Sequence, residues 1–164
     1  MPEISLFGWM HTGIAILAVL TGIYTLARYK VIRIEQLAGR IYLIFTVLAA
    51  ASALGIYKHG GFGIAHGLAV LTLLAVLVGV IAEKTSLFGS LSRPIQAGLY
   101  SATFLFHMIP AITESLLRLP TDSPVITALN DPLLQGFHLA FLVIYLVGLR
   151  LQIVWLRNVT IERG

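Results

Sequence analysis

"GFGIAHGLAVLTLLAVLVGV", residues 61–80, is the stretch of sequence that decides the fold. Its only ionisable side chain is the imidazole of His66, close to its start. About 20 apolar residues in a helix that rises about 1.5 Å per residue cover the roughly 30 Å hydrocarbon core of a bilayer. The stretch therefore predicts a transmembrane helix with a histidine near one end.

The rest of the chain has the composition of such helices. Of its 164 residues, 58% are apolar and 11% are charged, whereas soluble domains have about 45–50% and about 25%. No linker separates a second domain, so we expect residues 1–164 to form one domain. The sequence predicts an all-α integral membrane protein, a bundle of five transmembrane helices at approximately residues 6–27, 40–57, 63–82, 95–117 and 133–156.

Positive charges indicate how this bundle is oriented, because cytoplasmic loops of membrane proteins carry an excess of lysine and arginine. One side holds Arg28, Lys30, Arg33, Arg40, Lys84, Arg93, Arg157 and Arg163, and the opposite side holds only Lys58 and Arg118. We therefore expect the N-terminus outside and the C-terminus in the cytoplasm. The same bias explains the net charge of +4, so nucleic acid is not an expected partner.

Four of the predicted helices each carry one histidine in the half nearest the outer face. These residues are His11, His66, His107 and His138, and His59 lies in the outer loop above them. Ionisable residues inside membrane helices are costly and usually face the bundle interior, where they pair with one another. Each histidine taken alone has a simpler interpretation, a buried imidazole bonded to a carbonyl group of the next helix. The four together predict a shared site.

Glu114 is a further candidate for this site. Thr103, His107, Pro110 and Glu114 fall on one face of the fourth predicted helix by their spacing. A carboxylate in this place would orient His107, join it as a metal ligand or carry a proton. The alternative is a solvated carboxylate at the membrane interface.

The absence of cysteine excludes disulfides, thiolate ligands, iron–sulfur clusters and covalently attached haem. Three chemistries remain. The first is haem b held non-covalently by two histidines on facing helices. The second is a non-haem zinc, copper or iron site with His11, His66, His107, His138 and Glu114 as ligands. The third is a proton or ion pathway in which the histidines titrate.

Small residues near the histidines would let a flat ligand, or another helix, approach the backbone closely. Gly8, Gly13, Gly63, Gly67 and Gly136 flank the histidines, and Ala15, Ala18, Gly22 and Thr25 follow His11 along its face. On the fifth predicted helix, His138, Tyr145 and Gln152 share a face and extend a polar track inward. Helix packing alone is the alternative explanation for the glycines.

Three segments carry a family resemblance: "GWMHTGIAILAVLTGIYTLAR", "GRIYLIFTVLAAASAL" and "GFGIAHGLAVLTLLAVLVGV". They resemble the first three helices of an uncharacterised family of bacterial predicted membrane proteins with histidines at helix ends. The resemblance covers about half of the chain. A family histidine precedes the GR-Y motif, where this chain has Glu35 and Gln36. The resemblance implies a bacterial inner-membrane protein and carries no activity across.

From these observations we expect a small inner-membrane redox protein that binds haem b through a pair drawn from His11, His66, His107 and His138. Electrons would be exchanged with quinol or with an outer-side redox partner. The alternatives are the non-haem metal protein, which uses the same histidines with Glu114, and a transporter or structural subunit. The lipid bilayer is the expected surrounding, and a second copy of the chain is a further candidate partner. The sequence does not decide whether the protein is an enzyme.

Overall fold

Hydrophobic runs separated by polar turns give a chain of helices in the computed structural model, which describes residues 5–57 and 61–161. No strand occurs in those two ranges. The elements are α1 (Leu6–Tyr29), α2 (Leu37–Ala53), α3 (Ile64–Lys84), a short 3-10 helix η1 (Gly89–Leu91), α4 (Ser92–Arg118) and α5 (Pro132–Ile161). The predicted all-helical class is confirmed.

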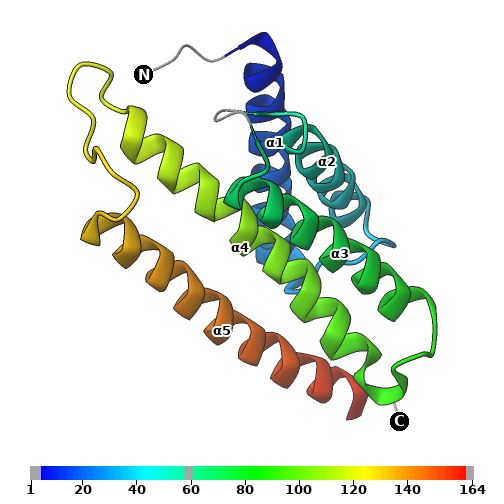
Figure 1. Ribbon diagram of the computed structural model, residues 1–164. Coiled ribbons are helices and arrows are strands. Elements are labelled where there is room, and N and C mark those ends of the chain that lie inside the picture. Colours follow the sequence, from blue (N-terminus) through cyan, green and yellow to red (C-terminus); the bar gives the residue numbers. More distant parts are fainter. Residues whose placement is uncertain (1–4, 58–60, 162–164) are drawn as a thin grey trace.

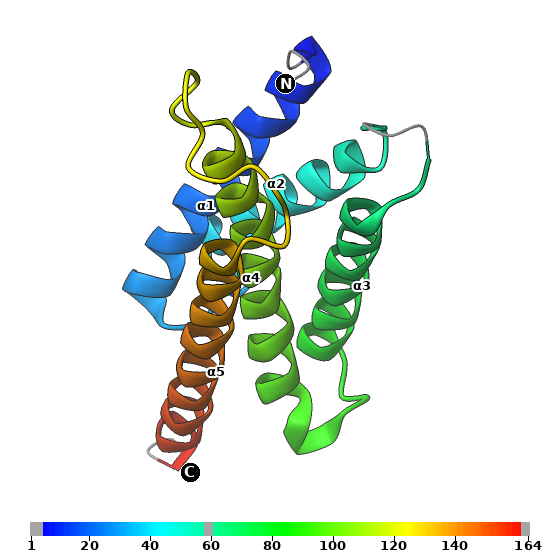
Figure 2. The ribbon, with the colours of Figure 1, turned by 60° about the vertical axis from the view of Figure 1, so that its left-hand side comes forward.

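Successive helices run in opposite directions, and each packs beside its neighbour in the chain (Figure 1). As a result α1, α3 and α5 begin at one end of the bundle, called the first end below, and finish at the other, the second end. The central helix is α4, which contacts α3, α5 and α1. Figure 2 shows α5 alongside α4 at one side of the bundle, with much of its surface uncovered.

Four helices, α1, α3, α4 and α5, are long and apolar enough to cross a membrane. The fifth, α2, has 17 residues, which is about 26 Å at the usual rise and less than the roughly 30 Å of a hydrocarbon core. The predicted range 40–57 is wrong at both ends, since α2 begins at Leu37 and ends at Ala53. After Ala53 the backbone tightens into i to i−3 hydrogen bonds at Gly55 and Ile56, so the apolar residues there do not extend the helix.

The core is built from aromatic rings set against small residues. Tyr42 and Tyr100 are fully buried. A Cβ atom added at Gly22 would come within 2.9 Å of the rings of Tyr42 and Phe104. Glycine at this position therefore lets α1 approach α2 and α4 closely. The predicted row of small residues along α1 is a packing surface, with Ala18, Gly22 and Thr25 buried.

The connection between α1 and α2 is buried at Val31 and Ile32, unlike most loops. Ile32 has no exposed surface, and its carbonyl oxygen accepts a hydrogen bond from Gln96 of α4. Gln152 of α5 donates to the carbonyl oxygen of Lys30 at 2.7 Å. Glu83 of α3 accepts from the backbone N–H of Ile34 at 2.9 Å. Side chains from three helices thus satisfy the backbone groups of this loop.

Candidate functional site

His11 lies about one and a half turns after the start of α1, near the first end. Its Nδ1 is 2.9 Å from the hydroxyl oxygen of Ser52 on α2. That hydroxyl donates its only proton to the carbonyl oxygen of Ala49 at 3.0 Å, so the His11 Nδ1–H must be the donor to Ser52. This chain of hydrogen bonds assigns the tautomer of His11 and leaves the lone pair on Nε2.

His107 lies on α4 about three turns before its end. Its Nε2 is 3.1 Å from the hydroxyl oxygen of Thr46, and its ring lies edge-on to Tyr42 with 6.3 Å between centroids. Tyr42 bonds to Thr103 at 2.6 Å. Thr103 donates to the carbonyl oxygen of Tyr100, which makes Tyr42 the donor in its bond to Thr103. His107 therefore rests on a hydrogen-bonded network in the core, because Tyr42, Thr46 and Thr103 are fully buried.

His11 and His107 are both bonded to α2, and the helices that carry them, α1 and α4, are in contact. Their hydroxyl partners, Ser52 and Thr46, both lie on α2, so one helix positions both rings. Ring orientation by a hydrogen bond at one nitrogen is the usual arrangement of a histidine that ligates through the other.

His66 has a different environment from this pair. Its Nδ1 accepts a hydrogen bond from the backbone N–H of Gly63 at 3.1 Å, which caps the start of α3. Its ring lies between Tyr57 and Phe62, with centroid distances of 4.8 and 5.0 Å. A neutral imidazole that accepts at Nδ1 carries its proton on Nε2, and this Nε2 is buried and has no hydrogen-bond partner among the residues that the structure describes. In this arrangement His66 offers a hydrogen-bond donor and no lone pair at Nε2.

His138 of α5 bonds to α4 rather than to another histidine. Its Nε2 is 3.2 Å from the hydroxyl oxygen of Thr113, which donates to the carbonyl oxygen of Ile109. Tyr145 and Gln152 bond to Gly98 and Ser101 of α4. The predicted polar face on the fifth helix is confirmed, and it joins α5 to α4.

Glu114 forms an ion pair with Arg118 one turn further along α4, at 2.7 Å. Its side chain is 44% exposed, as expected for a carboxylate near a helix end. Within residues 5–57 and 61–161, no group of three or more His, Cys, Asp and Glu side chains is arranged to hold a metal ion. His59 and Lys58 lie outside the described residues. The role of Glu114 as a ligand and the four-histidine metal site stay predictions.

A haem between α1 and α4 requires two nitrogen donors and room for a flat ring. The assigned tautomer of His11 and the anchored ring of His107 fit the donor requirement. The glycines beside the histidines do not mark a close contact, since a Cβ atom added at Gly13, Gly67 or Gly136 would meet nothing within 4 Å. The two imidazoles supply the nitrogen donors that haem b needs, whereas the groove beside α1 and α4 is lined by neither His11 nor His107.

Sequence reasoning missed Ser52, Thr46 and Tyr42, which orient the two histidines. One signal was available: Tyr42 and Thr46 are four residues apart in an apolar helix, so they share a face. The reasoning also missed an acidic pair at the second end. A hydrogen bond from the Glu83 carboxyl, with a further one from Lys84, lowers the pKa of Glu35 to about 2. Tyr100 donates to the other oxygen of Glu83 at 3.0 Å.

Comparison with known proteins adds no relative. No family model, curated protein or solved structure matches this chain.

Proposed function

We propose that this chain is an integral membrane protein of the bacterial inner membrane that binds haem b between α1 and α4, with His11 and His107 as the axial ligands. In this proposal all five helices lie in the bilayer, with the first end outside and the C-terminus in the cytoplasm. The protein exchanges electrons with quinol or with a redox partner at its outer side.

The observation that carries the proposal is the hydrogen bond from His11 Nδ1–H to Ser52. It holds the imidazole in the tautomer whose Nε2 lone pair would coordinate iron. His107 of α4 is held by a hydrogen bond to Thr46 of α2. Two oriented imidazoles on neighbouring helices are what non-covalent ligation of haem b in a helical bundle uses.

The arrangement supports haem more than a non-haem metal site. Two protein nitrogens complete the axial ligands of a haem, whereas zinc, copper and non-haem iron sites generally take three or more protein ligands. Within the described residues no group of three or more such side chains is arranged to hold a metal, and His66 offers a donor at Nε2. A haem site therefore uses the residues as they lie.

The side chains of this chain would bind, orient and shield the group. Ser52 and Thr46 set the directions of the two imidazoles, and the hydrogen bond between the buried Tyr42 and Thr103 joins α2 to α4 beside them. When bound, haem b supplies one-electron transfer at its iron. The apolar surround of the helices keeps water away from that iron, which is one of the ways a protein sets a haem potential.

Positive charge supports the orientation. Lys30, Arg33, Lys84 and Arg93 lie at the second end of the bundle, while Arg118 lies at the first end. Cytoplasmic placement of the positive end puts His11 and His107 in the outer leaflet. Quinol diffuses in the bilayer and would meet the pair from the side, and a protein partner would meet it from outside.

Single alanine variants of the four histidines test the ligand assignment. Each variant is purified in detergent, and its visible spectrum is recorded oxidised and after reduction with dithionite. We expect His11→Ala and His107→Ala to lose the haem bands and His138→Ala to keep them. Circular dichroism and size-exclusion chromatography show which variants retain the fold. This control is needed above all for His66→Ala, which removes the cap and the ring stacking at the start of α3.

Three outcomes would overturn the assignment. Loss of haem in His138→Ala with retention in His107→Ala would move the axial pair to α5. A colourless wild type with stoichiometric zinc, copper or iron would replace the haem proposal by the non-haem one. A wild type that binds neither haem nor metal would leave the histidines as proton carriers or as buried structural residues.

A further inference from the structure

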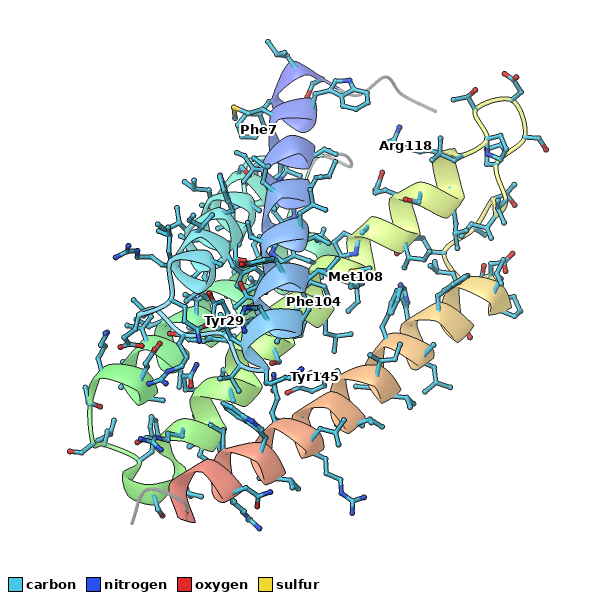
Figure 3. All side chains as sticks on the ribbon, turned by 180° about the vertical axis from the view of Figure 1, so that it is seen from behind. Phe7, Tyr29, Phe104, Met108, Arg118 and Tyr145 are labelled. Atoms are coloured by element: carbon cyan, nitrogen blue, oxygen red, sulfur yellow. The ribbon has the colours of Figure 1, made fainter. Side chains whose placement is uncertain are left out.

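A groove lies between α1, α4 and α5, separate from the histidine pair and reaching toward the second end. Its cavity volume is about 500 Å³ and it is half open. The lining is mostly apolar and includes Phe104, Met108, Phe141, Tyr145 and Trp155. Figure 3 shows the labelled Phe104 and Met108 beside the lower half of α1, and Tyr145 between the end of α1 and α5.

The polar groups that line the groove are bonded within the protein. Tyr145 donates to the carbonyl oxygen of Gly98 at 3.3 Å. Ser101 donates to Gln152 Oε1 at 2.9 Å, and Gln152 Nε2 donates to the carbonyl oxygen of Lys30 at 2.7 Å. Each of these polar side chains therefore has a bond within the protein and the rest of the lining is apolar, so the groove favours an apolar occupant such as a hydrocarbon chain.

The groove is long enough to hold such a chain through one leaflet. On α5 its lining extends from Phe141 to Trp155, which is about 21 Å along the helix. One leaflet of hydrocarbon is about 15 Å deep, half of the roughly 30 Å core. A tryptophan at one end of the lining agrees with a groove that reaches the interface, where tryptophan is enriched.

Lys30 supplies a cation at this end of the groove. It is exposed and lines the groove, and its ammonium group makes one weak hydrogen bond, to the carbonyl oxygen of Ala27 at 3.4 Å. Within the described residues, no carboxylate forms an ion pair with it, in contrast to Lys84, which is paired with Glu35 at 2.8 Å. An unpaired ammonium at the end of an apolar groove matches a lipid phosphate.

We propose that this groove binds one anionic phospholipid, with an acyl chain between α4 and α5 and the phosphate at Lys30. The inference needs only that the chain lies in a membrane, and it is independent of haem. The bound lipid would fill the space that the bundle leaves between α1 and α5 and so fix α5 against the other helices.

The test uses delipidated protein in detergent, titrated with phosphatidylglycerol or with phosphatidylcholine, and native mass spectrometry to count the bound lipids. We expect one phosphatidylglycerol to bind before any phosphatidylcholine does. Lys30→Gln should weaken phosphatidylglycerol binding about fivefold, the equivalent of about 1 kcal/mol for one lysine near the headgroups. Arg150→Gln is the matched control, since Arg150 is an exposed cation on α5 that does not line the groove.

A second pair of variants tests the acyl chain. Gly148 lines the groove, and an added Cβ atom there would meet nothing within 4 Å. Gly148→Leu should therefore fold normally, fill the groove and abolish the specific lipid adduct. Gly67→Leu on α3 is the control, because Gly67 also faces open space but lies outside the groove.

Equal binding of both lipids, or an equal loss in Lys30→Gln and Arg150→Gln, would overturn the phosphate site. A lipid adduct that survives Gly148→Leu would overturn the acyl-chain site. Co-purified quinone that Gly148→Leu displaces would show that the occupant is a quinol instead. The visible spectrum of the same samples reports haem separately, so the two proposals fail or stand independently.

Discussion

His11 on α1 donates a hydrogen bond of 2.9 Å to Ser52 on α2, and its direction is set because the Ser52 hydroxyl donates its own proton to Ala49. A single serine thus decides which nitrogen of His11 carries the lone pair. Groups that orient a metal-ligating histidine in this way commonly contribute roughly 10- to 100-fold in metal affinity.

Replacement of Ser52 by alanine tests this relationship. We expect Ser52→Ala to weaken haem binding by roughly 10- to 100-fold, because the imidazole loses its orienting acceptor. The measurement is a haem titration of the apoprotein, followed by absorbance. Thr12→Val is a suitable control, since Thr12 is next to His11 but its hydroxyl bonds only to Gly8 of its own helix, at 2.9 Å. Equal affinities of Ser52→Ala and wild type would contradict the orienting role.

The buried network under His107 contributes to stability. Tyr42→Phe removes the hydroxyl that donates to Thr103 and leaves that acceptor without its donor. We expect the free energy of unfolding to fall by about 0.5–1.5 kcal/mol, as for other buried hydrogen bonds. Denaturant unfolding in detergent measures it, with Tyr57→Phe as the control because Tyr57 is 60% exposed. A Tyr42→Phe protein as stable as wild type would show that the bond contributes nothing.

Two glycines of α1 should respond in opposite directions to alanine. At Gly22 the new methyl group would come within 2.9 Å of Phe104 and Tyr42, and such overpacking commonly costs about 1–3 kcal/mol. At Gly13 it would meet nothing within 4 Å, so Gly13→Ala should gain up to about 1 kcal/mol of helix propensity. Melting temperatures of the two variants measure the difference. A gain in Gly22→Ala would refute the close approach of α1 to α2 and α4.

Low pH should destabilise the fold because it protonates Glu35 at the second end. Hydrogen bonds from Glu83 and Lys84 lower its pKa from 4.5 to about 2. A lowered folded-state pKa gives stabilisation that is complete above the unfolded pKa and is lost as pH falls through the folded pKa. We therefore expect stability to fall between about pH 4.5 and pH 2 in wild type. In Glu35→Gln this part of the pH dependence should disappear, and a variant with the wild-type profile would remove Glu35 as its cause.

The proposed orientation can be tested with single cysteines, because the chain contains none. Ser123 is exposed on the loop between α4 and α5 at the first end, and Ser90 is exposed in η1 at the second end. With the first end outside, Ser123→Cys in intact cells should react with a membrane-impermeant thiol reagent and Ser90→Cys should not. The opposite labelling pattern would place the histidine pair in the cytoplasmic leaflet.

Much of the fold follows from hydrophobic runs, since each long apolar segment became a helix near its predicted place. The end of α2 could not be predicted from these runs, because the apolar residues after Ala53 form tight turns that hydropathy does not distinguish from helix. The buried loop between α1 and α2 was also beyond prediction. Its burial depends on Gln96, Gln152 and Glu83, which come from three other helices.

The sequence predicted near which end of its helix each histidine lies, but not toward which partners it points. Position along a helix places a histidine near one end, yet the direction in which it points depends on how the helices are rotated against one another. His11 and His107 turn toward partners on α2, whereas His66 turns back to Gly63 and the rings of Tyr57 and Phe62. The rotation of each helix about its axis cannot be predicted from a single sequence.

The most direct test of the central claim is the reduced-minus-oxidised visible spectrum of the purified wild-type protein, with iron determined on the same sample. The proposal predicts a sharp Soret band, α and β bands that appear on reduction, and one haem iron per chain. A spectrum without these bands from protein that is folded and supplied with haem would contradict it.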